Sequence, residues 1–128
     1  MSGNHPDDTR PRLDGSHTQW RWNASHAEPL NLNAIEACHQ PSARWRISPN
    51  IYPPGTEFAC SSRAALVYVL EGQCTYELGI DQGTWTLQRG DVAQLPEGRF
   101  RFRVSGDTPV SLVQVWELPR EFWSRDKV

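Results

Sequence analysis

The chain has 128 residues, of which 38% are hydrophobic, and its formal net charge is −2 at pH 7. A chain of this length forms one domain that buries roughly two-thirds of its unfolded surface. Scattered basic residues and a small net charge argue against a nucleic-acid or anionic-membrane partner. No apolar stretch approaches the roughly 20 residues of a membrane span, and the polar first residues lack a signal-peptide core. We therefore expect a cytoplasmic protein.

The first third of the chain predicts a tail followed by irregularly placed strands. Residues 1–18 are rich in Pro, Asp, Gly, Ser and Arg, which predicts a flexible tail ahead of a single domain at 19–128. Trp20 and Trp22 alternate with polar residues, as in a strand. The apolar residues of 30–35 predict a further edge strand.

The rest of the chain predicts many short strands. An alternating pattern at 43–48 indicates a half-buried strand, and the prolines of 50–55 exclude a central strand there. Further strands are expected at 64–70, 74–78, 84–87, 92–95, 99–104 and 110–118, with a short helical turn at 119–126. Strands bounded by Gly and Pro in this way predict an all-β sandwich or barrel.

Two spaced motifs suggest a family. Gly55 is followed by YVLEG at 68–72, and Gly90 is followed at fixed spacing by Pro96 and Gly98. These residues resemble the two motifs of the cupins. The resemblance implies a double-stranded β-helix, or jelly-roll barrel, with the motifs at 53–105.

The resemblance also gives the positions of the family's metal ligands, and other residues stand there. The first-motif glutamate falls on Ala65, and the second-motif histidine and asparagine fall on Arg101 and Ser105. The histidine pair of the first motif falls either on Ala59 and Ser61 or on Phe58 and Cys60.

The cysteines and histidines offer little to replace those ligands. Three cysteines without CxxC spacing argue against a disulfide framework or a zinc knuckle. No histidine follows residue 40, whereas cupin metals require several imidazoles and a carboxylate, and a guanidinium cannot ligate. We expect no metal and no cofactor. The alternative, a site made by Cys60, Cys74 and His39, would restore a metal-dependent dioxygenase.

The family's pleat predicts which side chains line the barrel. Those expected to point inward are Ala59, Ser61, Ala65, Val67, Val92, Gln94, Arg101 and Arg103. On the last strand, Leu112, Gln114 and Trp116 are expected on the cavity face, because a buried amide needs a partner. The aromatic walls would come from Tyr76, Trp116 and either Phe100 or Phe102. The predicted binding residues are Ser61, Gln94, Phe102, Arg103, Gln114 and Trp116.

Three residues are candidates for catalysis. Arg101 inside a barrel would hold a carboxylate, phosphate or carbonyl. The alternative register places both phenylalanines inward and the arginines in water, since a slip of one residue reverses the faces. Cys60 near Arg63 or Arg101 could form a thiolate that acts as nucleophile or base, or it could be a buried thiol. Tyr76, like Tyr68, could transfer a proton.

Two classes of function remain. The first is a metal-independent isomerase, epimerase or cyclase acting on a small carbonyl-bearing or acidic molecule, as the resemblance suggests. The second is a non-catalytic protein that binds a small molecule, and the lack of a general base favours it. The segment from Trp20 to Ile35 would cover a sheet edge of a second subunit, which predicts a homodimer through the N-terminal strands.

Overall fold

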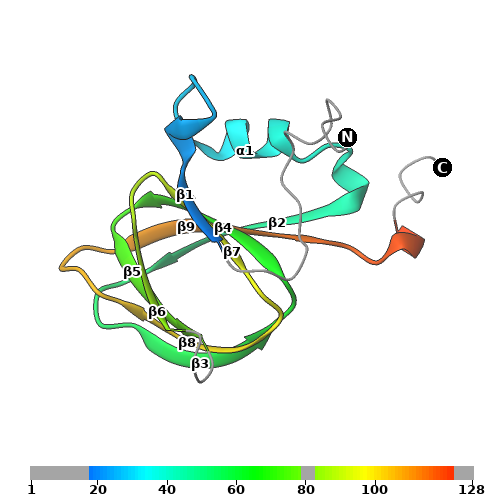
Figure 1. Cartoon of the computed structure of the whole chain (residues 1–128). Helices are drawn as coiled ribbons and strands as arrows, with labels where there is room; N and C mark the ends of the chain where they lie inside the picture. The colour runs from blue at the N-terminus through cyan, green and yellow to red at the C-terminus, as the bar shows by residue number, and fades with distance from the viewer. Residues whose placement is uncertain (1–17, 79–82, 123–128) are drawn as a thin grey trace, which may run out of the picture.

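The computed structural model describes residues 18–78 and 83–122, which form two antiparallel sheets facing each other across a barrel (Figure 1). The strands are β1 (Thr18–Arg21), β2 (Trp45–Tyr52), β3 (Glu57–Ser62), β4 (Ala65–Glu71), β5 (Gln73–Leu78), β6 (Thr84–Gln88), β7 (Asp91–Leu95), β8 (Gly98–Val104) and β9 (Val110–Glu117). One helix, α1 (Leu32–Cys38), and three short 3-10 turns complete the described elements. In this part of the chain no helix is long and apolar enough to cross a membrane.

The strand order confirms the all-β jelly roll. The first sheet has the order β1-β7-β4-β9-β2, and the second has the order β3-β8-β5-β6. Strands distant in sequence are therefore neighbours, and successive strands often change sheets, as in a double-sheet jelly roll. β2 lies at a sheet edge, where its Pro49 removes no central ladder bond.

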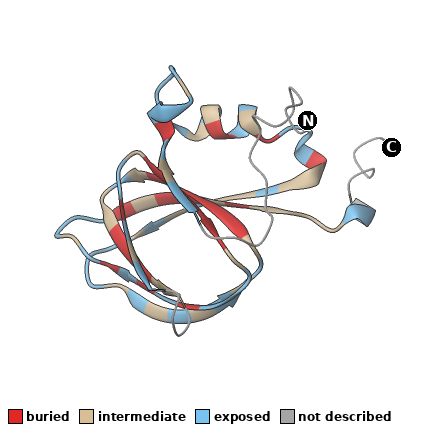
Figure 2. Ribbon diagram, viewed as in Figure 1, coloured by how far each residue is buried: buried red, intermediate tan, exposed pale blue. Residues whose placement is uncertain are grey.

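Side-chain alternation divides the core into two clusters. Val67, Ala93 and Leu112 belong to the cluster inside the barrel. Leu66, Val92 and Val113 belong to a second cluster, on the outer face of the first sheet. Figure 2 shows buried positions along this sheet and in the helix above it. The first sheet is therefore covered on both faces, which accounts for the continuous apolar run of β4.

The edge strand expected at 30–35 is wrong, because most of this segment forms α1. The Asn31 side chain accepts a hydrogen bond from the Ala34 backbone N–H at 2.9 Å and caps the helix. Leu32 and Ile35, three residues apart, lie on the face that packs against the outer cluster. Asn31 as an N-cap residue was the sequence signal for a helix, and the alternation of apolar residues did not show it.

Two motif glycines are required by the turns they occupy. Gly72 has φ +82° and Gly90 has φ +90°, a region that favours glycine. A Cβ at Gly72 would collide with the backbone oxygen of Pro109, and one at Gly90 would lie 2.7 Å from the Arg21 guanidinium. The spacing of these glycines therefore reflects how closely neighbouring turns approach.

The ends of the chain match the sequence predictions only in part. Trp20 lies in β1 as expected, but Trp22 begins a 3-10 turn and is 4% exposed, packed against Tyr68 of its own chain. The homodimer through the N-terminal strands stays a prediction. The tail, apart from Thr18, lies outside the described residues, as does the second half of the helical turn expected at 119–126, of which 120–122 form a 3-10 turn.

Candidate functional site

A cavity of about 380 Å³ opens at one end of the barrel. This volume is within the range of small-molecule sites, about 300–1,000 Å³. Its walls come from β2, β3, β5, β8 and β9, so both sheets contribute. The lining residues are Tyr52, Phe58, Cys60, Ser61, Ser62, Arg63, Tyr76, Phe100, Phe102, Gln114 and Trp116.

The inner wall is an aromatic cluster. The ring of Phe102 lies 5.0 Å from that of Phe58 and 5.1 Å from those of Tyr52 and Tyr76, and Tyr76 lies 5.2 Å from Phe100. Edge-to-face and tilted contacts at these distances are favourable and hold the rings in place. The cavity therefore has one stiff, apolar side.

Inside the cavity, the phenols of Tyr52 and Tyr76 and the thiol of Cys60 are neutral. Burial raises the pKa of the Tyr76 phenol well above its usual value, and a hydrogen bond from Gln114 opposes this rise in part. Burial likewise raises the pKa of Tyr52, with a further contribution from Cys60. Burial also raises the pKa of the Cys60 thiol. The thiolate expected at Cys60 is therefore disfavoured, and the cavity offers hydrogen-bonding groups without charge.

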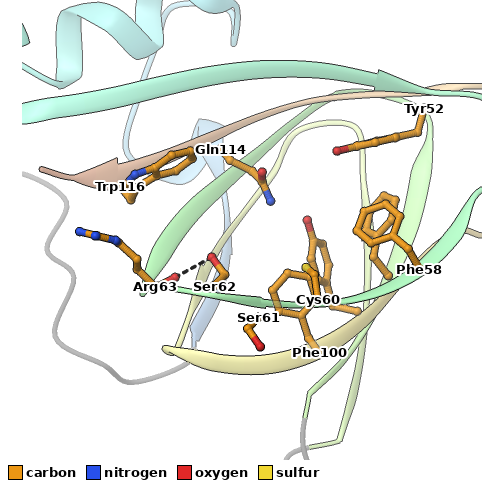
Figure 3. Close-up of a pocket in the computed structure, with 11 residues that line it drawn as sticks. Tyr52, Phe58, Cys60, Ser61, Ser62, Arg63, Phe100, Gln114 and Trp116 are labelled. Atoms are coloured by element: carbon orange, nitrogen blue, oxygen red, sulfur yellow. Dashed lines mark hydrogen bonds between the residues drawn. The ribbon is translucent and has the colours of Figure 1, made fainter.

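The mouth of the cavity carries a different chemistry (Figure 3). The Ser62 hydroxyl donates a hydrogen bond to the Arg63 carbonyl oxygen at 2.9 Å. The Arg63 guanidinium and the Trp116 indole lie toward the same side of the opening, while the phenol of Tyr52 and the amide of Gln114 point into the cavity.

The inward register expected for β3 and β8 is wrong. Cys60 pairs with Phe100 and faces the cavity, whereas Ala59 pairs with Arg101 and both are exposed. Phe100 and Phe102 are buried inside, so the arginines between them project into water. The alternation of large aromatic and cationic side chains decides this, because burying guanidinium groups is far more costly than burying phenyl rings.

Arg101 and Arg103 therefore belong to an ion-pair ladder on the outer surface. Arg101 lies 3.2 Å from Glu57 and 3.9 Å from Glu77, and Arg103 lies 3.5 Å from Glu77. All four side chains are about half exposed, so these pairs contribute little to stability. Neither arginine lines this cavity, although Arg101 borders a separate surface hollow with Arg99 and Glu77. The catalytic role of Arg101 stays a prediction that its place inside the barrel no longer supports.

Two further positions differ from expectation. Gln94 pairs with Leu66 of the outer cluster, so it and Val92 lie outside the barrel. Ser61 lies on the outer face of β3 and contributes only to the rim of the cavity. Its hydroxyl is directed away from the cavity in Figure 3. Both errors follow from placing the pleat one residue out of phase.

Several expected positions are confirmed. Ala65 and Val67 lie on the barrel face, as do Tyr76 and Phe102. Gln114 and Trp116 line the cavity, and Val113 and Val115 lie on the opposite face. Sequence reasoning missed Tyr52 and Ser62 as lining residues. It named Phe58 only as an alternative motif position and Arg63 only as a neighbour of Cys60. These four residues lie in or beside strands whose inward face the sequence did not show.

Comparison with known proteins shows the fold. No family description and no curated protein matches the sequence. The structure is similar to oxalate decarboxylase of Bacillus subtilis, with a TM-score of 0.53 and 16% identity over 66% of this chain and 28% of that one. It is similar to protein NMB1881 of Neisseria meningitidis, with a TM-score of 0.52 and 17% identity over 71% of this chain and 100% of that one.

A third structure carries the family name. It is the Cupin_2 domain of an XRE family transcriptional regulator from Enterobacter cloacae, with a TM-score of 0.52 and 16% identity over 81% of this chain and 98% of that one. The chain has the cupin fold. At these identities the likeness concerns the fold alone, and the chain spans little more than a quarter of the length of the oxalate decarboxylase.

The cavity does not fit the metal site that the cupin fold implies. Within residues 18–78 and 83–122, no three His, Cys, Asp or Glu side chains come together to hold an ion. The inward first-motif pair is Phe58 and Cys60, and the glutamate position is Ala65. One thiol, two phenols and an amide do not make the imidazole and carboxylate set that such metals prefer.

The alternative site made by Cys60, Cys74 and His39 is also wrong. Cys74 is buried inside the barrel, where burial raises the pKa of its thiol to about 12. His39 is fully buried on the other side of the first sheet, with its Nε2 2.7 Å from the Tyr68 hydroxyl. A sheet separates these potential ligands.

Proposed function

We propose that this cupin barrel is a metal-independent pocket for a small organic molecule. The observation that carries the proposal is a cavity of about 380 Å³ that combines an aromatic wall with convergent neutral hydrogen-bonding groups. An apolar lining with few fixed polar groups is typical of small-molecule sites. The described residues offer no ionised base inside the cavity, so recognition is favoured over demanding proton abstraction.

The hydrogen-bonding groups favour a ligand with a carbonyl or hydroxyl at its inner end. Gln114 provides both a donor and an acceptor, and the neutral phenols of Tyr52 and Tyr76 can do either. Once a ligand fills the cavity and displaces water, a polar group left without a partner is costly. A ligand lacking matching polar atoms would therefore bind less well than one that has them.

A second candidate is a metal-independent isomerase or cyclase, and the contact between Tyr76 and Gln114 favours it. A phenol held neutral by burial can donate a hydrogen bond to an oxygen on which negative charge develops. The cavity would otherwise act by holding a flexible substrate in a reactive conformation. Arg101, which projects into water, has no part in this version.

The test begins with the purified protein. After growth in metal-supplemented medium, we expect less than about one-tenth of an equivalent of transition metal, as for a protein that binds metal weakly or not at all. We also expect native mass spectrometry to detect a co-purifying organic molecule. A Cys60→Trp variant, which fills the cavity, should lose that molecule. The surface variant Arg101→Gln should retain it. Stoichiometric metal, or a ligand retained equally by both variants, would overturn the proposal.

A further inference from the structure

The ionised side chain that lines the cavity is positively charged. Among the eleven lining residues there is no Asp, Glu, Lys or His, and Arg63 is the single ionised side chain. A cationic ligand would be repelled there, and a ligand of high negative charge would enter an apolar cavity without enough compensation. The lining therefore favours a ligand with one negative charge.

Arg63 is available to bind that charge. Its side chain is exposed, and within residues 18–78 and 83–122 its guanidinium has neither an ion pair nor a hydrogen bond. Arg21 and Arg44, by contrast, each lie within 2.8 Å of a carboxylate, and Arg101 and Arg103 belong to the surface ladder. A guanidinium presents two parallel donors, which match the two oxygens of a carboxylate.

A hydrogen bond from the preceding residue restrains the backbone of Arg63. The hydroxyl of Ser62 donates to the Arg63 carbonyl oxygen, which restrains the backbone just after β3. Arg46 lies opposite Trp116 in the β2–β9 ladder and adds positive charge on the same side of the sheet. Arg63 in the lining and Arg46 on the neighbouring strand therefore both place positive charge on this side of the barrel.

The walls favour a flat molecule. Trp116 at the mouth is partly exposed, and Phe100 lines the same cavity from the other sheet. The packed rings behind them leave a space bounded by aromatic faces and edges, which suits a planar conjugated body. At the inner end, Gln114 and the two tyrosines supply the polar contacts.

Building on the proposed function, we infer that the ligand is a planar aromatic or conjugated monocarboxylate. Its carboxylate binds Arg63 at the mouth, and its ring system lies between Trp116 and Phe100. A hydroxyl or carbonyl at the opposite end hydrogen-bonds Gln114. The class is defined by three features together: one negative charge, flatness, and a polar atom at the end remote from the charge.

The test uses matched probes in calorimetric titrations. The first probe is a hydroxynaphthoate with its hydroxyl and carboxylate at opposite ends, and the second is the corresponding uncharged hydroxynaphthamide. We expect the acid to bind the wild-type protein about tenfold or more tightly than the amide, as a charge-assisted contact implies. In Arg63→Met this preference should disappear, whereas in Arg89→Met, which removes another exposed arginine in the β6–β7 turn, it should persist.

Two further comparisons sharpen the result. The acid's affinity should fall with added salt in the wild-type protein and much less in Arg63→Met. Naphthoate without the hydroxyl should bind the wild-type protein several-fold more weakly than the hydroxylated acid, because it lacks one buried hydrogen bond. This difference should vanish in Gln114→Leu.

The outcomes separate this inference from the proposed function. If acid and amide bind equally and Cys60→Trp abolishes both, the barrel binds small molecules but the carboxylate assignment is wrong. If neither probe binds, or if Arg63→Met retains the preference for the acid, the inference is also overturned. If binding survives in Cys60→Trp, the cavity itself is not the site and both proposals fail.

Discussion

The two faces of the sheet β1-β7-β4-β9-β2 are built from the same strands but differ in how they are filled. On the outer face, α1 and Trp22 pack against Leu66 and Val113. On the inner face, the barrel core is packed, but a cavity remains between Gln114 on this sheet and residues of the second sheet. A helix can pack closely against a sheet and exclude water. Strands that are hydrogen-bonded into a barrel cannot move closer together to close the space between them.

Each face also contains a buried tyrosine with a polar partner. Tyr68, on the outer face, contacts His39 at 2.7 Å, and the other ring nitrogen of His39 has no hydrogen-bond partner among the described residues. Tyr76, on the inner face, is paired with Gln114, which borders the cavity. One pair is sealed and contributes to stability, whereas the other remains accessible to a ligand.

The largest expected effect tests how tightly the outer face is packed. Ile35 of α1 is fully buried, so Ile35→Ala should lower the free energy of unfolding by about 2–5 kcal/mol. The matched control is Ile51→Ala, since Ile51 is 73% exposed, and it should change stability by less than about 0.5 kcal/mol. Urea unfolding measures both. A cost for Ile35→Ala close to that of the control would show that α1 is not packed on the sheet.

The next effect depends on pH. Burial lowers the pKa of His39 from 6.5 to about 4, so the unfolded chain binds this proton more tightly than the folded protein. Stability from the neutral imidazole is complete above pH 6.5 and is lost as the pH falls toward 4, by about 3 kcal/mol. The neighbouring Tyr68 and Cys38 have raised pKa values and stay neutral throughout this range.

The measurement is the free energy of unfolding of wild type and His39→Leu at several pH values from 4 to 7. The variant lacks the titrating group, so its stability should fall less steeply with acid than that of the wild type. Parallel curves for the two proteins would mean that His39 is protonated in the folded state as easily as in the unfolded chain.

The smallest effect compares the two tyrosines directly. Tyr68→Phe leaves both nitrogens of buried His39 without a partner and should cost about 1–3 kcal/mol. Tyr76→Phe removes a partner of Gln114, but water in the open cavity can replace it, so the cost should stay below about 1 kcal/mol. The two variants differ from wild type by the same atom. Equal losses in urea unfolding would contradict the distinction between a sealed and an open pair.

Much of the fold was predictable from local signals. The Gly and Pro turns and the alternating strands indicated an all-β barrel, and Gly72 and Gly90 occupy the turns that their spacing implied. The helix was missed, although Asn31 at its N-cap was a usable signal. A short amphipathic helix and a short edge strand share similar apolar content, and only the cap distinguishes them.

The site was less predictable, because it depends on which face of each strand points inward. Gln114 and Trp116 were placed correctly, since a polar residue within an otherwise apolar strand indicates its own cavity side. Arg101 and Gln94 were misplaced, because motif spacing left the pleat uncertain by one residue. Arg63 was noted only as a cation near Cys60, and its place at the mouth follows from the pairing of β3 with β8 and from the facing sheet that holds β9.

The sequence alone determined the barrel class and the replacement of the family's metal ligands, because turn residues and residue identities are local properties. The tertiary structure decided the register of β3 and β8, the uncharged groups inside the cavity and the position of Arg63 at its mouth. These depend on burial and on contacts between distant strands, where the high cost of enclosing a guanidinium turns one face of β8 inward and the other to water.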